Sequence, residues 1–206
     1  MVKTSRMPLN PRQIKEKHMS KWTISKEFHF EAGHRVWAQQ LNNPELSIST
    51  ECACKHLHGH SYTIKVNLTS DMLDQSSMVT DFKNINFMKK FVDEVLDHKF
   101  MLDTNDPNFA IITGVTLDAG ESRGDTRLQN YIASGKIFGN LGEILPSEFP
   151  ATQLHRDSFV LVNFVPTSEN ICKYLKEHAQ KMIGDVATVS ALELWETKKS
   201  YCRYED

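Results

Sequence analysis

A run of alternating residues in the first third of the chain constrains the fold most strongly. From His58 onward, every second side chain falls on one face, and the side chains between them are small or polar. Such an alternation is typical of a β-strand that buries one face. The strand therefore points two histidines inward, side by side. The residues of this face are His58, His60, Tyr62, Ile64, Val66 and Leu68.

The start of this strand is rich in side chains that bind metals and move protons. A catalytic zinc site typically takes three protein ligands and keeps its fourth position open. We expect His58 and His60 to reach one metal ion from a single strand face, and His34 to arrive from a neighbouring strand as the third ligand. One alternative is a closed structural site made of Cys52, Cys54, His58 and His60. The other is a set of ordinary surface histidines.

The composition bounds the class of protein. The chain has 206 residues, of which 40% are hydrophobic, so it can bury a large core and a single domain is expected. Lys and Arg number 24 against 26 Asp and Glu, which favours neither a nucleic acid nor a membrane as partner. Apolar runs stay well short of the roughly 18 residues of a membrane span. A cytoplasmic protein is expected, in which the four cysteines serve metal binding or catalysis rather than a disulfide scaffold.

The remaining patterns predict strands, then helices, then strands, which is an α+β order. A helix is indicated where an N-cap residue precedes apolar residues at helical spacing, and a glycine marks its end. The expected elements are a strand over 22–30 that ends just before His34, a helix from Asp81 to Asp97, a helix from Pro166 to Gly184, and a strand or hairpin arm over 189–204.

The expected single domain covers residues 22–206, with a tail before it and an insertion within it. Residues 1–21 carry six Lys or Arg against one Glu, which predicts a basic flexible tail, with a transit peptide as the alternative. Residues from about 103 to 157 are interrupted by glycines and prolines. Long stretches with a weak pattern inside a compact domain are usually functional or elaborations. We therefore expect an insertion there, with a short helix over 129–134 and a strand over 159–164 behind it.

Further candidate residues lie where the expected elements end. Asp97-His98 closes the first helix, and Glu196 stands in the final strand. Taken alone, the first pair predicts a salt-linked helix end, and the glutamate predicts a solvent-facing side chain. Beside a cysteine their meaning changes, because a thiol near a divalent metal ion and an imidazolium has a lowered pKa and can act as a general base near pH 7.

Six short motifs follow one another along the chain, and their order resembles one enzyme family. They are Phe30-Glu31-Ala32-Gly33-His34-Arg35, Cys54-x3-His58-Gly59-His60-Ser61, Val79-Thr80-Asp81-Phe82, Leu96-Asp97-His98, Pro166-Thr167-Ser168-Glu169-Asn170 and Glu196-Thr197. Together they resemble the 6-pyruvoyl-tetrahydropterin synthase superfamily over roughly residues 22–102 and 159–204.

The spacing between the thiol and the His-Gly-His triplet separates the branches of this family. Three intervening residues, as from Cys54, resemble the 6-carboxy-tetrahydropterin synthases of queuosine biosynthesis. Five, as from Cys52, resemble the 6-pyruvoyl-tetrahydropterin synthases. The remaining details look more like the first branch. These are Leu57-His58-Gly59-His60-Ser61, Pro166-Thr167-Ser168-Glu169 and the ending Cys202-Arg203-Tyr204.

The resemblance implies a fold, an assembly and a reaction. The fold is the tunnelling fold, an antiparallel sheet with two main helices on one face. The assembly is a homo-hexamer of two stacked trimers with sites at subunit interfaces. The reaction is the Zn²⁺-dependent conversion of 7,8-dihydroneopterin triphosphate to 6-carboxy-5,6,7,8-tetrahydropterin, acetaldehyde and triphosphate.

The resemblance also assigns catalytic roles. Zinc would be held by the three histidines named above, and Cys54 as thiolate would remove a side-chain proton. Asp97 would orient His98, which would donate or relay protons. Glu196 matches the family's pterin anchor, which accepts paired hydrogen bonds from the ring.

Three further residues are implied in substrate binding. Thr167 and Glu169 would help hold the pterin ring from an adjacent subunit, although Thr167 also reads as a helix N-cap. Arg35 is a weak candidate for contact with the triphosphate, which needs fixed positive charge.

Overall fold

Two long antiparallel strands, β1 (Trp22–His34) and β2 (His58–Ser70), form the centre of the fold. The computed structural model describes residues 21–40, 45, 52–115 and 123–205. The basic tail predicted over residues 1–21 therefore lies outside the described part, apart from its last residue. The alternation of β2 is confirmed, since Tyr62 and Ile64 are buried in the core. β1 extends further than predicted, so that His34 is its last residue.

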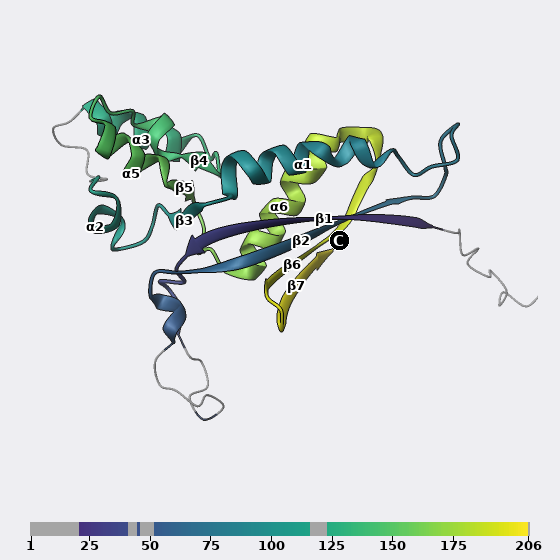
Figure 1. The fold of residues 1–206 in the computed structure, drawn as a ribbon, viewed down its shortest axis with the longest axis horizontal. Coiled ribbons are helices and arrows are strands. Elements are labelled where there is room, and N and C mark those ends of the chain that lie inside the picture. The colour runs from purple at the N-terminus through teal and green to yellow at the C-terminus, as the bar shows by residue number, and fades with distance from the viewer. Residues whose placement is uncertain (1–20, 41–44, 46–51, 116–122, 206) are drawn as a thin grey trace, which may run out of the picture.

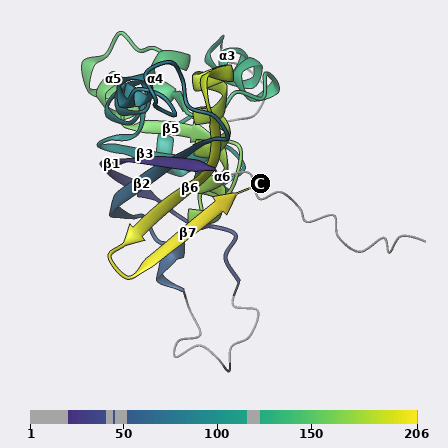
Figure 2. The same cartoon turned by 90° about the vertical axis from the view of Figure 1, so that its right-hand side faces the viewer.

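The sheet grows on both sides of this pair. On one side β6 (Thr188–Thr197) pairs with β2 and β7 (Ser200–Glu205) pairs with β6, both antiparallel, as the predicted hairpin requires. On the other side β3 (Lys99–Asp103) runs parallel to β1, and β5 (Phe159–Val162) runs parallel to β3. The short β4 (Gly139–Asn140) closes that edge. Within the described residues the sheet has seven strands in the order β4-β5-β3-β1-β2-β6-β7, and Figure 2 shows them from β5 to β7 in this order.

This sheet confirms the α+β class and corrects one detail of it. The sheet is mixed rather than wholly antiparallel, because β3 and β5 join β1 in parallel. Parallel neighbours need crossover connections, and the segment between β3 and β5 supplies one. The four strands β1, β2, β6 and β7 keep the antiparallel pairing that was predicted.

The helices α1 (Asn86–Phe91) and α6 (Ser168–Ile183) cover one face of this sheet (Figure 1). Asp81 caps the 3₁₀ turn η3 (Phe82–Ile85) through a 2.7 Å hydrogen bond from the Lys83 amide, and the π-helical turn η4 (Val92–Leu96) continues α1. Thr167 caps α6, and Gly184 ends it with a φ of 59°, as predicted. Apolar side chains of both helices and of the β2 inner face form one core cluster.

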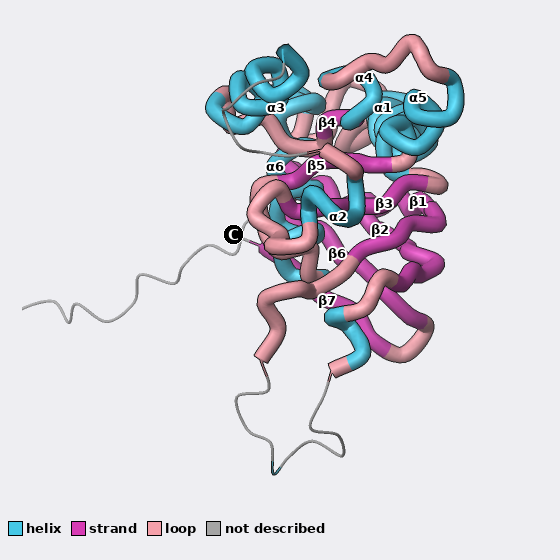
Figure 3. The backbone as a smooth tube through the Cα atoms, turned by 90° about the vertical axis from the view of Figure 1, so that its left-hand side faces the viewer, coloured by secondary structure: helices cyan, strands magenta, loops and turns pink. Residues whose placement is uncertain are grey.

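The segment between β3 and β5 folds as a small helical layer at the β4 end of the sheet (Figure 3). It contains α2 (Phe109–Thr113), α3 (Arg123–Ala133), α4 (Leu141–Ile144) and α5 (Pro150–Asp157). The predicted helix over 129–134 is the end of α3. A second hydrophobic cluster, which includes Phe109, Leu128 and Leu141, packs this layer on β3 and β5. Within the described residues, the weak sequence pattern therefore covers four helices and a short strand, and their origin as an insertion stays a prediction. Across the described ranges, no helix has the length and apolar character needed to span a membrane.

Candidate metal centre

Three histidines converge where β1 ends and β2 begins. The strand register sets His34 directly opposite His58, and His60 follows two residues later on the same face. Their ring centroids lie 4.5 to 5.2 Å apart, and one ligand nitrogen from each lies within 4.8 Å of the others. This is the arrangement predicted from the alternation, and it could hold a metal ion.

Backbone carbonyls orient two of the three rings. His34 Nδ1 lies 2.7 Å from the Pro166 carbonyl oxygen, and His58 Nδ1 lies 2.8 Å from that of His56. A ring nitrogen that faces a carbonyl oxygen carries the proton, so the lone pair is on Nε2. Both Nε2 atoms are buried and lack a hydrogen-bond partner in the described part of the chain. Because unpaired buried polar atoms are costly, this donor set fits a metal ion.

The protonation of these rings also suits metal binding. Burial lowers the pKa of His34, and the neighbouring charges of His58 and His60 lower it further, against the opposing effects of Pro166 and Glu196. Burial likewise lowers the pKa of His60. Only a neutral imidazole can ligate a metal ion, so His34 and His60 stay available as ligands below the usual histidine pKa.

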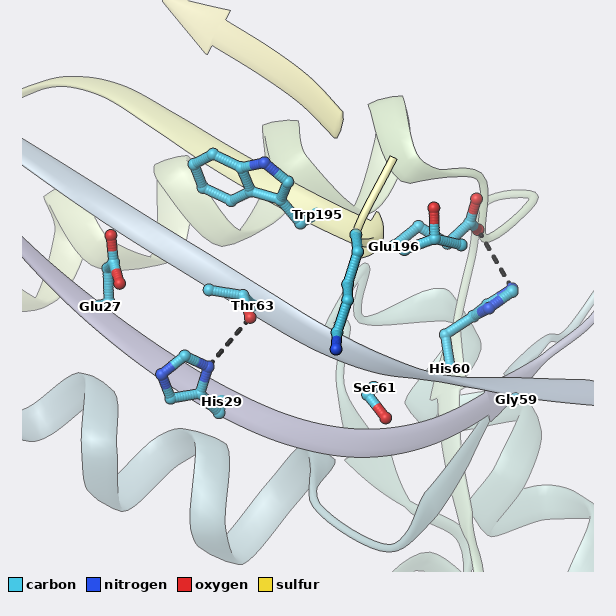
Figure 4. Close-up of a pocket in the computed structure, with 10 residues that line it drawn as sticks. Glu27, His29, Gly59, His60, Ser61, Thr63, Trp195 and Glu196 are labelled. Carbon is cyan, nitrogen blue, oxygen red and sulfur yellow. Dashed lines mark hydrogen bonds and ion pairs between the residues drawn. The ribbon is translucent and has the colours of Figure 1, made fainter. Parts of the chain in front are cut away.

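Glu196 reaches the same centre from β6. Its Oε1 lies 3.4 Å from His34 Nε2 and 3.7 Å from His60 Nε2, and Figure 4 shows it pointing toward His60. It also lines a pocket of about 690 Å³ with Ser61 and Trp195. The carboxylate therefore stands between the metal ligands and an open space in which a substrate can bind.

Cys54 lies in the 3₁₀ turn η2 (Ala53–Lys55) that precedes β2, and it is half-buried. Burial raises the pKa of its thiol, and Cys52 and the negative charge of Glu196 raise it further. The thiol is thus within electrostatic reach of the carboxylate, as a base near the metal centre must be. Without a cation beside it, however, the group is a thiol rather than a thiolate at neutral pH.

Asp97 and His98 form a linked pair beside β1. Asp97 Oδ1 accepts a 2.9 Å hydrogen bond from the Glu31 amide, and its Oδ2 lies 2.9 Å from His98 Nδ1. The Glu31 bond and then His98 lower the pKa of Asp97. His98 has a φ of 56° and an imidazole that is 80% exposed, and a left-handed backbone at a non-glycine residue is a feature of functional sites. The pair was expected at the catalytic centre, and the structure places His98 in a pocket of about 440 Å³ that His60 also lines.

The three remaining predicted residues lie close to the ends of these elements. Thr167 accepts a 3.3 Å hydrogen bond from the Asn170 amide as the α6 N-cap, and Glu169 is exposed in the first turn of the helix. Arg35 follows His34, and its Nε lies 3.2 Å from Asp106 Oδ2. Its charge thus faces a carboxylate of the segment after β3, and its contact with a triphosphate stays a prediction.

The sequence did not predict the groups that orient the three histidines or pack beneath them. Tyr62 packs beneath the rings of His34 and His60, at 6.0 and 5.7 Å between centroids, and the alternation already placed it on their face. The orienting carbonyls of His56 and Pro166 could not be predicted from the sequence, because every residue has a backbone carbonyl and no residue type marks these two. Pro166 is 132 residues from the histidine that it orients.

Comparisons with known proteins agree with this geometry. The family model described as 6-pyruvoyl tetrahydropterin synthase matches residues 23–206. The chain is 32% identical over 196 residues to the 6-carboxy-5,6,7,8-tetrahydropterin synthase of Aquifex aeolicus, covering 90% of this chain and 99% of that one. The enzyme of the same name from Haemophilus influenzae is 25% identical over 187 residues, covering 89% and 98%.

Solved structures confirm the fold. The chain resembles an uncharacterised protein from Wolinella succinogenes with a TM-score of 0.73 and 36% identity, covering 91% of this chain and 99% of that one. It also resembles the 6-pyruvoyl tetrahydropterin synthase of Plasmodium vivax, with a TM-score of 0.53, 18% identity and coverage of 91% and 98%. At that identity the second likeness concerns the fold alone.

Proposed function

Because this chain belongs to the 6-pyruvoyl tetrahydropterin synthase family, we propose that it is a zinc-dependent 6-carboxy-5,6,7,8-tetrahydropterin synthase. It would convert 7,8-dihydroneopterin triphosphate to 6-carboxytetrahydropterin, acetaldehyde and triphosphate. The observation that carries the proposal is the histidine triad with its unpaired Nε2 atoms. The shared name of the Aquifex and Haemophilus relatives favours the carboxy product.

His34, His58 and His60 would hold the zinc ion. When bound, zinc supplies Lewis-acid polarisation of the oxygens on the substrate side chain. The chain's own contribution is twofold: burial favours the neutral forms of His34 and His60, and the carbonyls of Pro166 and His56 aim the rings of His34 and His58. Three protein ligands leave a coordination position for the substrate, as catalytic zinc sites do.

The surrounding side chains bind the pterin and transfer protons. Cys54 removes a proton from the substrate side chain, and Glu196 binds the ring N–H and amino group of the pterin through its two oxygens. His98, held by Asp97, donates or relays protons during triphosphate loss and carbon-carbon cleavage. These roles are supported by the approach of Glu196 to the triad and by the pocket that His98 shares with His60.

The assembly is part of the same proposal. A homo-hexamer of two stacked trimers would bring Thr167 and Glu169 of one subunit to the pterin of another. Arg35 would contact the triphosphate. An uncovered edge is available for such assembly, because β7 lies at the end of the sheet and its outward residues are exposed. Sheet edges in native proteins are covered or paired. Analytical ultracentrifugation of the full chain tests the size.

The product decides the reaction. Purified zinc-loaded protein is incubated with 7,8-dihydroneopterin triphosphate, and the products are identified by mass, with acetaldehyde measured separately. The proposal predicts 6-carboxytetrahydropterin and one acetaldehyde per turnover. A 6-pyruvoyl product without acetaldehyde would assign the chain to the sister activity, for which Cys52 has the matching spacing to the His-Gly-His triplet.

Metal removal separates the enzyme from a zinc-stabilised binding module. A structural zinc site folds with its metal, so a chelator unfolds the protein, whereas a catalytic site loses activity and keeps its fold. The large apolar core that packs without the metal ligands supports the second outcome. Circular dichroism before and after chelation, with activity restored by added zinc, is the measurement.

A further inference from the structure

Two carboxylates are buried where β3 ends and the helical layer begins. Asp103 is the last residue of β3, and Asp106 lies in the turn that follows; the two residues are 2% and 3% exposed. A buried carboxylate is unfavourable unless donors or positive charges pair with it, so the partners of these two groups indicate what they do. Neither is among the groups to which the proposed function gives a role.

Both carboxylates hold the segment that follows β1. Asp103 Oδ2 accepts a 2.8 Å hydrogen bond from Trp37 Nε1, and Asp106 Oδ2 forms an ion pair with Arg35 Nε at 3.2 Å. These contacts come after the backbone pairing of β1 with β3, so side chains fasten the chain here. We call this segment, residues 35–37, the strap. Bonds to an ionised acceptor are stronger than neutral ones, so the strap is firmly held.

The strap in turn holds the turn that carries Cys54. The Val36 amide, in the middle of the strap, donates a 2.8 Å hydrogen bond to the Cys54 carbonyl oxygen. The backbone bonds that the amides of Lys55 and His56 donate are local, because their acceptors lie three residues back in the same turn. The bond from the strap joins this turn to the end of β1, just after His34.

We infer that Asp103 and Asp106 are positioning residues, which place the Cys54 thiol beside the histidine triad by way of the strap. A general base must lie within hydrogen-bond reach of the proton that it removes, so the position of this turn matters to the reaction. The inference rests on the proposed function, which makes Cys54 the base. The rival explanation is that the two contacts only fasten the helical layer to the sheet.

Hydrogen exchange of the full chain tests the connection without substrate or metal. Trp37→Phe removes the donor and keeps an aromatic ring, and Asp106→Asn removes the charge and keeps the shape. If the strap holds the turn, the amides of residues 55–56 should exchange about tenfold faster in both variants, because the turn opens more often. Mass spectrometry of the peptide that carries them gives the rate. Tyr131→Phe is the matched control and should leave the rate unchanged, since its Oη lies 3.5 Å from the Leu161 carbonyl oxygen, where the helical layer packs on β5.

A double-mutant cycle tests the consequence for catalysis. Trp37→Phe and Asp106→Asn are each made in the parent chain and in Cys54→Ala, and turnover of 7,8-dihydroneopterin triphosphate is measured per bound zinc. In the parent chain each should lower kcat about tenfold or more with KM little changed, since a misplacement of about 1 Å can cost 10²-fold. In Cys54→Ala the same changes should cost nothing further, because the base that they misplace is absent.

The outcomes separate this inference from the proposed function. Equal losses of kcat in both backgrounds, or exchange rates equal to those of the parent, would overturn the positioning role of Asp103 and Asp106 and leave the proposed function standing. A parent chain without turnover would refute the proposed function, and the exchange rates would then still decide whether the strap holds the turn.

Discussion

The choice between two cysteines is the sharpest prediction from this structure. Cys52 and Cys54 are two residues apart and both half-buried, yet each matches a different branch of the family by its spacing to the His-Gly-His triplet. The negative charge of Glu196 raises the pKa of the Cys54 thiol, and this interaction supports Cys54 as the base beside the histidine triad. We predict that Cys54→Ala abolishes most of the activity and that Cys52→Ala changes it little.

The size of the effect follows from the role of the thiol. A positioned general base contributes a factor of roughly 10²–10⁴ in rate, or about 2.7–5.4 kcal/mol at 1.36 kcal/mol per factor of ten. A thiol with the ordinary pKa of 9.0 is about 1% ionised at pH 7. Cys54 lies above that value in the metal-free site, so less of it is ionised. The base therefore works only when a cation lowers its pKa, and its reaction with iodoacetamide at pH 7 should become faster when zinc is added.

The assay measures turnover of 7,8-dihydroneopterin triphosphate by each variant, together with zinc content and circular dichroism. Both variants should keep the zinc and the fold, because the triad supplies the ligands and neither thiol is in the buried core. Cys54→Ala should lose a factor of 10² or more. A large loss from Cys52→Ala with normal turnover by Cys54→Ala would refute the assignment and favour the 6-pyruvoyl branch.

Three further outcomes are expected. His34→Ala should weaken zinc binding by more than the 10–100-fold typical of outer-shell changes, measured by competition with a chromogenic chelator; unchanged affinity would exclude this ligand. The metal-free protein should lose thermal stability as the pH falls from 7.5 to 5, because the lowered folded-state pKa values of His34 and His60 leave the unfolded chain binding more protons; a flat or opposite profile would contradict this. Thr167→Ala should remove about 1 kcal/mol through the lost N-cap, or about 2–4 °C in melting temperature, and Thr167→Ser should retain it; equal melting temperatures for both would deny the capping role.

The sequence predicted those parts of the fold that depend on residues close together in the chain. The β2 alternation, the Thr167 cap and the Gly184 stop of α6 each depend on neighbouring residues, and the structure confirms all three. The histidine triad was also predictable, because the period of a strand places His58 and His60 together. His34 was predicted as the third ligand because it follows the neighbouring expected strand, and the register of β1 against β2 sets it opposite His58.

The rest depends on contacts between distant residues. The parallel pairing of β3 with β1 and of β5 with β3 joins segments that are far apart in the chain. The apolar residues of the helical layer between β3 and β5 are too scattered for a periodic signal. Phe109, Leu128 and Leu141 meet only in the folded cluster. The carbonyl of Pro166 likewise reaches His34 through the docking of α6 on the sheet, which no spacing in the sequence encodes.

The glycine of the His-Gly-His triplet shows why this spacing matters to the site. Gly59 lies directly opposite Gly33 in the strand pair, so the two glycines share the outer face while His58 and His34 meet on the inner face. A Cβ atom on Gly59 would lie 3.0 Å from the Ala32 carbonyl oxygen, so a larger residue there would require the neighbouring strand to shift. The two glycines, Gly33 and Gly59, also line the pocket that His60 shares with His98. A side chain at Gly59 would crowd the Ala32 backbone and reduce the pocket that His60 shares with His98, so the glycine keeps this pocket open.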